Sequence, residues 1–185
     1  MYQFPEYPPI KSKPDMWALQ NFLLKKAEEL IGAKDQTKTI FQPTFEGDRP
    51  CIMNSVQGDG AWASLSSNAS NYWPTALYEL AHETIHLLDP TIGFTNYLEE
   101  GIAVAFSLEL SRSQTNHPMP VPTDKFYGRA LELVNKLPEN PFVSAREIRK
   151  KCQKLSLAKP QDLKELFPEI DEETAHALCS ECNFT

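Results

Sequence analysis

The residues best suited to chemistry form one short motif, His82-Glu83-x-x-His86. On a helix, residues four apart share a face, about 40° round the axis and about 6 Å along it. Two imidazoles placed in this way can bind one divalent metal ion, and the glutamate between them can act as a general base. The spacing therefore predicts a metal-binding helix. The alternative is an ordinary surface helix whose histidines are simply solvated.

A second acidic segment offers a third ligand. Glu99 and Glu100 stand just before the apolar run 101–106. Glu99 has a structural use, because Asn96 followed by a glutamate three residues later is a capping-box signature at a helix start. Glu100 has no such use, and a carboxylate at the mouth of a buried helix needs a positively charged partner. A divalent metal ion would supply that partner.

The elements that carry these residues fit an antiparallel helix pair. Helices predicted over 74–88 and 97–112 are joined by about eight residues. At 1.5 Å per residue, His82 and His86 lie about 9 and 3 Å from the end of the first helix, and Glu100 about 5 Å into the second. The three side chains then meet at one level. Two histidines and one glutamate leave the fourth position of a catalytic zinc ion open.

These residues resemble the zincin metallopeptidases, and in particular their gluzincin branch. The resemblance covers 77–106 and rests on the histidine motif and on Glu99-Glu100-Gly101-Ile102-Ala103. It implies one zinc ion with Glu100 as third ligand and a peptide or protein as substrate. It also implies that Glu83 takes a proton from the attacking water and passes it to the leaving amine, in agreement with general acid–base chemistry.

The sequence signals for further site residues are less specific. Tyr127 and His117 are candidates for stabilising the oxyanion, although a helical tyrosine is more often packed and a loop histidine more often solvated. In zincins an edge strand holds the peptide substrate, and the resemblance places this strand at Ala61, Trp62 and Ala63. A core strand with a buried Trp62 is an equally good interpretation.

The rest of the chain predicts an α+β fold. A helix from Asp15, the expected N-cap, to Ile31 precedes short β-rich segments, and helices follow. We expect a small, mostly antiparallel sheet with the helices packed on one face, as in zincins. The expected strands are 39–45, 51–56 and 61–65, and the expected later helices are 124–137, 143–153, 161–167 and 171–180.

The length of 185 residues argues for one main domain. Residues 1–14, with four prolines, are predicted to form an extended arm without regular structure. A single zincin-like domain is expected over 15–185. Within it, 15–70 would form a helix and the sheet, 71–112 the metal-binding helix pair, and 113–185 the C-terminal helices.

Composition excludes several classes of protein. With 41% hydrophobic residues the chain can form a core, which excludes overall disorder. The net charge of -7, without a basic stripe, makes nucleic acid an improbable partner. No apolar stretch approaches the roughly 20 residues needed to cross a membrane. The first residues lack the pattern of a signal peptide, which favours the cytoplasm, and the oligomeric state stays open.

The four cysteines are too few for a disulfide scaffold, so free thiols are the default interpretation. Cys179 and Cys182, spaced as Cys-x-x-Cys, also suggest a structural zinc site with Cys152, or a reversible disulfide.

Three functions follow from these observations. The first is a zinc-dependent peptidase, the second a zincin-fold scaffold that retains the metal without catalysis, and the third a metal-free helical domain.

Overall fold

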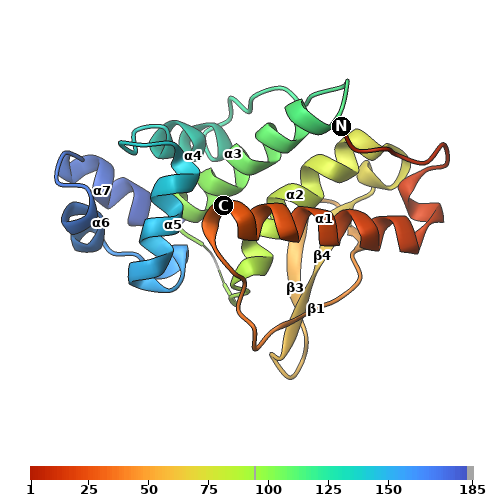
Figure 1. The fold of residues 1–185 in the computed structure, drawn as a ribbon, viewed down its shortest axis with the longest axis horizontal. Helices are drawn as coiled ribbons and strands as arrows, with labels where there is room; N and C mark the ends of the chain where they lie inside the picture. The colour runs from red at the N-terminus through yellow and green to blue at the C-terminus, as the bar shows by residue number, and fades with distance from the viewer. Residues whose placement is uncertain (94, 183–185) are drawn as a thin grey trace. The chain divides into compact units, whose positions relative to one another are not determined.

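The computed structural model describes residues 1–93 and 95–182. Figure 1 shows the elements in chain order. They are η1 (Pro9–Lys11), α1 (Lys13–Ile31), β1 (Thr39–Ile40), β2 (Thr44–Gly47), β3 (Cys51–Asn54), β4 (Gly60–Ser66), η2 (Ala69–Asn71), α2 (Trp73–Leu88), α3 (Tyr97–Gln114), α4 (Tyr127–Val134), α5 (Pro141–Cys152), η3 (Leu155–Leu157), α6 (Pro160–Leu166) and α7 (Glu172–Cys179). Helices and a small sheet confirm the α+β class.

The chain divides into two compact units. Unit 1 comprises 1–28, 33–90 and 106–120, and unit 2 comprises 29–32, 91–105 and 121–185. Unit 1 contains the sheet and α2, and unit 2 contains α4 to α7. The residues of α1 and α3 are divided between the two units.

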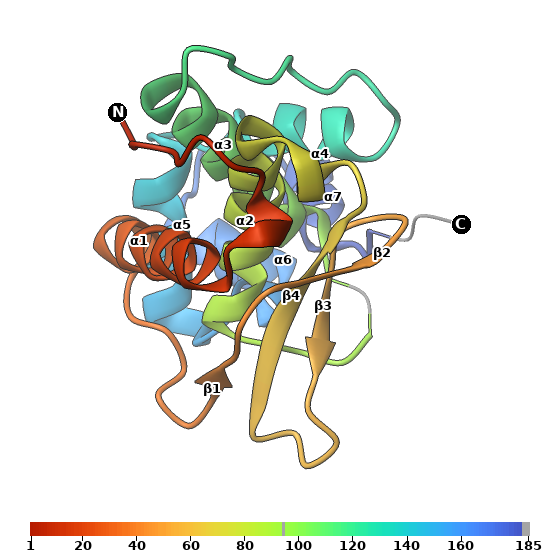
Figure 2. The ribbon, with the colours of Figure 1, turned by 90° about the vertical axis from the view of Figure 1, so that its right-hand side faces the viewer.

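The sheet of unit 1 is built around β4 (Figure 2). Strand β4 runs parallel to β1 and β2 and antiparallel to β3. The prediction of a mostly antiparallel sheet is therefore wrong, since only the β3–β4 pairing is antiparallel. The prediction failed because short strands separated by turn residues suggested hairpins between sequence neighbours. Instead, the consecutive strands β2 and β3 both pair with β4.

Strand β4 is the inner strand of the sheet, not an edge. Ala61 pairs with Ile40 of β1 and with Asn54 of β3, so β1 and β3 lie on opposite sides of β4. Ala61 and Ala63 are fully buried, as expected of a strand covered on both faces. The expectation that Ala61, Trp62 and Ala63 form a substrate-binding edge strand is therefore wrong, because both edges of β4 already pair with other strands.

Helix α1 begins earlier than the sequence suggested. Ser12 is the capping residue, since its Oγ accepts a hydrogen bond from the Asp15 amide at 3.3 Å. The predicted N-cap, Asp15, instead lies in the first turn and accepts a hydrogen bond from the Ser12 hydroxyl. Pro14 is compatible with this first turn, because its missing N–H has no intrahelical partner there. The segment 1–14 was expected to lack regular structure, but it contains the short 3-10 helix η1.

Helix α2 matches its predicted range and is buried along most of its length. Pro74 lies in the first turn, where the ring costs no helical hydrogen bond. The helix ends at Leu88, and the Asp89 amide donates to the His86 carbonyl at 3.3 Å. Pro90 follows, so the helix cannot continue. Burial extends to the polar residues in the middle of the helix, His82, Glu83, Thr84 and His86.

Helix α3 begins at Tyr97, as predicted. The Asn96 side chain accepts a hydrogen bond from the Glu99 amide at 2.9 Å, which confirms Asn96 as the N-cap. Gly101 packs against α4 so closely that a Cβ atom there would lie 2.4 Å from the Ala130 carbonyl oxygen and from a Val134 methyl group. Only glycine fits at this position, so the small residue allows the first turn of α3 to approach α4.

The later helices occur near their predicted places, shifted by a few residues at their ends. The largest difference is α4, which covers Tyr127–Val134 and not 124–137. Asp124 explains the later start, because it accepts hydrogen bonds from the amides of Phe126 and Tyr127 and so shapes a turn before the helix. Among the described residues, none of the helices combines the length and apolar character needed to cross a membrane.

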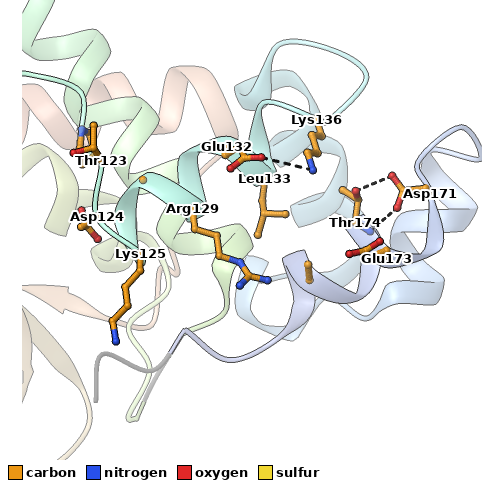
Figure 3. A pocket seen from close by; sticks show the side chains of 13 residues that line it. Thr123, Asp124, Lys125, Arg129, Glu132, Leu133, Lys136, Asp171, Glu173 and Thr174 are labelled. Atoms are coloured by element: carbon orange, nitrogen blue, oxygen red, sulfur yellow. Dashed lines mark hydrogen bonds and ion pairs between the residues drawn. The ribbon is translucent and has the colours of Figure 1, made fainter.

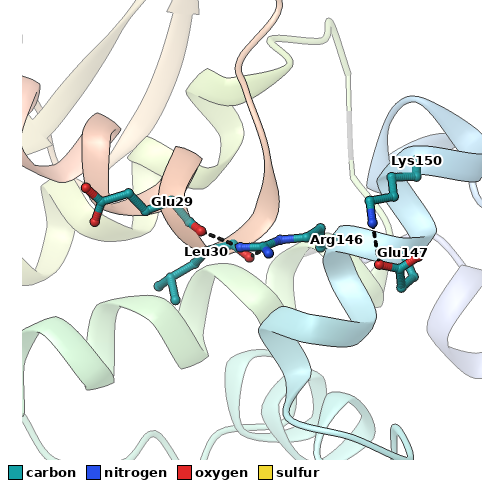
Figure 4. Close-up of polar contacts among 5 residues, drawn as sticks. All are labelled: Glu29, Leu30, Arg146, Glu147 and Lys150. Carbon is teal, nitrogen blue, oxygen red and sulfur yellow. Dashed lines mark hydrogen bonds and ion pairs between the residues drawn. The ribbon is translucent and has the colours of Figure 1, made fainter.

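Arginines of α5 bind the carbonyl groups at the end of α1 (Figure 4). Arg146 donates to the carbonyl oxygen of Leu30 at 2.9 Å and also to that of Glu29. The last carbonyls of a helix have no intrahelical donor, and positive charge is stabilising at this end. These contacts therefore satisfy carbonyl groups in the last turn of α1 that lack a partner within the helix.

We predict that Arg149→Ala lowers the free energy of unfolding by about 2 kcal/mol. Arg149 is buried and donates to the carbonyls of Ile31 at 2.9 Å and Gly32 at 2.7 Å. Lys150→Ala is the matched control, because its exposed ion pair with Glu147 contributes about 0.5 kcal/mol or less. Urea unfolding of both variants measures the difference, and equal stabilities would contradict the role of Arg149.

Candidate metal centre

His82 and His86 direct ring nitrogens toward each other on one side of α2. Their Nε2 atoms lie 3.4 Å apart, and the ring centroids are separated by 5.2 Å. The two residues are only 7% and 5% exposed. The alternative of solvated histidines is therefore wrong. It assumed that only the apolar stripe of α2 is covered, whereas the helix is buried on both sides.

The separation of the two nitrogens suits a shared metal ion. Zinc binds imidazole nitrogen at about 2.0–2.1 Å with tetrahedral geometry, so two nitrogens bound to one ion lie about 3.3 Å apart. The observed 3.4 Å agrees with this value. A lone hydrogen bond between two neutral imidazoles would also fit this distance, but it leaves no role for a carboxylate beside them.

Glu100 is the third member of the group. It lies in the first turn of α3 and is buried, and its Oε1 accepts a hydrogen bond from the Thr95 hydroxyl at 2.6 Å. One ligand atom from each of His82, His86 and Glu100 lies within 4.8 Å of the other two, so the group could hold a metal ion. Two imidazole nitrogens and one carboxylate oxygen are a donor set that suits zinc.

The start of α3 is anchored by backbone contacts with residues 180–182. The Tyr97 amide donates to the Ser180 carbonyl at 3.0 Å, and the Cys182 amide donates to the Thr95 carbonyl at 2.8 Å. Thr95 therefore contacts both the Glu100 carboxylate and this segment. Sequence reasoning missed Thr95, because a threonine in a loop carries no signal that distinguishes it from any other polar residue.

Glu83 lies one residue after the first ligand and is 3% exposed. Its negative charge acts on Cys51 of β3. Partial burial, as the larger cause, and the Glu83 carboxylate both raise the pKa of the Cys51 thiol. Cys51 itself is exposed at the surface. The first residue of β3 is therefore open to solvent and also close enough to Glu83 to feel its charge.

Two side-chain contacts fix α2 within unit 1. The Glu79 carboxylate accepts hydrogen bonds from the Ser66 amide at 2.9 Å and from the Ser66 hydroxyl at 2.6 Å. Gln20 of α1 donates to the Thr84 hydroxyl at 3.0 Å, and that hydroxyl donates to the Leu80 carbonyl. Glu79 therefore ties the helix to the end of β4.

The two oxyanion candidates lie on different elements. Tyr127 is the first residue of α4, in unit 2. His117 lies after α3 in unit 1, where its amide donates to the Thr115 hydroxyl and its ring meets Tyr72 edge-on with centroids 6.3 Å apart. A role in oxyanion stabilisation stays a prediction for both residues.

The cysteines are free thiols, as expected. Burial raises the pKa of Cys179 and of Cys182 to about 12. Among the described residues, the group of His82, His86 and Glu100 is the only set of three or more His, Cys, Asp or Glu ligands that could hold a metal ion. The structure therefore gives no support to a second zinc site at Cys152, Cys179 and Cys182.

A further hollow lies between α4 and α7 and has a volume of about 790 Å³ (Figure 3). Charged side chains line it, but two of its carboxylates have structural roles. Asp171 accepts hydrogen bonds from Thr174 as the N-cap of α7, and Asp124 accepts hydrogen bonds from the amides of Phe126 and Tyr127 in the turn before α4. No histidine or cysteine lines this hollow. It therefore does not form a second candidate centre.

No protein-family model, curated protein or solved structure matches the chain. The zincin resemblance therefore rests on the histidine motif and the group that it forms with Glu100.

We predict that Glu83→Gln lowers the pKa of the Cys51 thiol in metal-free protein. The thiol would keep the larger contribution from burial and lose the contribution from the negative charge. At a pH below this raised pKa, more thiolate forms, so iodoacetamide should alkylate Cys51 faster. Rates measured by mass spectrometry against pH test this. Glu46→Gln is the control, and an unchanged pKa in Glu83→Gln would contradict the proximity of Glu83 and Cys51.

Proposed function

We propose that the protein is a zinc-dependent peptidase. The observation that carries the proposal is the buried group in which two imidazoles, with Nε2 atoms 3.4 Å apart, share one site with the Glu100 carboxylate. Glu83 lies within the same turn of α2 as these imidazoles. Metal-binding residues combined with an adjacent buried carboxylate are the parts that metal-assisted hydrolysis requires.

His82, His86 and Glu100 would hold the ion. Bound zinc supplies a Lewis acid that polarises a carbonyl group and lowers the pKa of water. Three protein ligands leave one coordination position for the reactants, which distinguishes a catalytic from a structural zinc site. Thr95 supports the arrangement, because its hydroxyl holds one oxygen of the Glu100 carboxylate and so restricts its rotation.

Glu83 would act as the general base. Its carboxylate takes a proton from the water that attacks the peptide carbonyl and then gives this proton to the leaving amine. Glu83 directly follows His82 in α2, and its side chain is only 3% exposed.

A peptide or protein is the proposed substrate. The edge strand next to α2 is β3, since β4 is the inner strand. An extended peptide could add to such an edge by backbone hydrogen bonds. The influence of Glu83 on Cys51 places the start of β3 near the base. This assigns to β3 the role that the sequence had suggested for 61–63.

A cytoplasmic location is part of the proposal. The four free thiols support it, because reducing compartments keep cysteines unpaired. The second candidate function is a scaffold that retains the metal without catalysis, and Thr95 and the burial of the three ligands would serve it equally well.

We predict about one zinc ion per chain in protein purified without added metal. His86→Ala and Glu100→Ala should each lose the ion, because two remaining ligands bind zinc weakly. His117→Ala is the matched control and should keep it. Atomic absorption measures the zinc content. Chelation should lower the melting temperature of the parent protein, because the ion stabilises only the folded state. Zinc retained in Glu100→Ala would remove Glu100 from the ligand set.

We predict that Glu83→Gln keeps its zinc and loses roughly 100-fold or more of peptide cleavage. A library of fluorogenic peptides provides the assay, and zinc content and melting temperature confirm that the variant is folded. Unchanged cleavage would exclude Glu83 as the base. Absence of cleavage by the zinc-loaded parent protein would favour the scaffold function.

A further inference from the structure

A second cavity lies in unit 1, at the N-terminal end of α2. Its volume is about 560 Å³, and three segments line it: six of the first eight residues, Asn71–Pro74 and Gln114–His117. The lining residue Trp73 begins α2, nine residues before His82, which corresponds to about 14 Å along the helix axis. The cavity is therefore distinct from the metal-binding group.

The walls of this cavity are held by specific contacts. The indole nitrogen of Trp73 donates to the Tyr7 carbonyl at 2.7 Å, and the Phe4 ring stacks on Trp73 with centroids 5.7 Å apart. The Tyr2 amide donates to the Gln114 carbonyl at 3.3 Å. These contacts join segments that are far apart in the sequence, so the cavity is formed before any ligand arrives.

Aromatic faces dominate the lining. Tyr2, Phe4, Tyr7, Tyr72 and Trp73 all contribute to it. Tyr7 and Tyr72 remain 46% and 47% exposed. Tyr72 is kept in place by its edge-on contact with the ring of His117. Large aromatic rings exposed together in a concave site are a common mark of ligand binding.

The charge of the lining selects among ligands. Glu6 is an exposed carboxylate in the wall, and no lysine or arginine lines the cavity. The whole chain carries a net charge of -7. Aromatic faces attract cations through the negative potential above the ring, and a nearby carboxylate adds to this attraction. An anion would meet no lysine or arginine here and only His117 as a basic side chain, and a neutral apolar ligand would gain nothing from Glu6.

We propose that this cavity binds an organic cation of the alkylammonium class, with Tyr7 and Tyr72 facing the cationic group and Glu6 balancing its charge. The site is independent of the metal centre and of peptidase activity.

Choline and 3,3-dimethylbutan-1-ol provide the test, because they have nearly the same shape and differ in charge. An NMR titration that follows the Trp73 indole N–H measures both affinities in the full chain. We expect choline to bind at least about 5-fold more tightly than the neutral alcohol, the factor that one or two cation–aromatic contacts supply. Equal affinities would show a merely apolar pocket, and no binding of choline would overturn the proposal.

Single substitutions in the lining test which residues contact choline. Tyr72→Ala and Glu6→Gln should each weaken choline binding by roughly 2- to 5-fold, whereas Tyr72→Phe, which keeps the ring, should bind like the parent protein. Phe41→Ala and Glu46→Gln change an exposed ring and an exposed carboxylate outside the cavity and are the controls. Choline binding unaffected by both Tyr72→Ala and Glu6→Gln would place the ligand elsewhere and overturn the proposal. Zinc content serves as an independent readout, since none of these variants should change it.

Discussion

The burial of two facing imidazoles is the constraint on which the metal-binding group depends. His82 and His86 lie inside the protein with their Nε2 atoms 3.4 Å apart. Two N–H groups at this distance would repel each other, and two bare lone pairs would also repel. Either a hydrogen that one ring donates to the other or a metal ion bound by both rings must therefore lie between them. The carboxylate of Glu100, which has a ligand atom within 4.8 Å of both rings, favours the metal ion.

Such a group needs a helix that cannot turn or slide. Glu79 accepts two hydrogen bonds from Ser66 at the end of β4, and Gln20 reaches Thr84 from α1. These contacts lie on either side of His82 along α2, and each involves a buried or partly buried polar group whose loss would leave a partner unsatisfied. Rotation of α2 would break them at once. The position of the imidazoles is therefore set by residues that have no direct part in metal binding.

The sequence predicted the helices that carry the candidate site better than it predicted the sheet. The motif of His82 and His86 and the cap at Asn96 are local signals, because helical geometry alone determines which residues share a face and which residue satisfies the first amides. Strand pairing is not local. Nothing in 44–47 or 51–54 indicates that both segments pair with β4, so the direction of the strands and the inner position of Ala61 could not be predicted. The hydrogen bond from Thr95 to Glu100 could not be predicted either, since it depends on contacts made only in the folded chain.

The anchoring of α3 by residues 180–182 has a consequence for the timing of folding. The backbone contacts of Thr95 and Tyr97 with Ser180 and Cys182 close a long loop, whose chain entropy must be overcome before the contacts form. On the ribosome, the segment that carries Glu100 cannot acquire these contacts until residues 180–182 have emerged. A nascent chain would therefore hold both histidines well before its carboxylate ligand is fixed, which delays assembly of the complete centre until synthesis has passed this point.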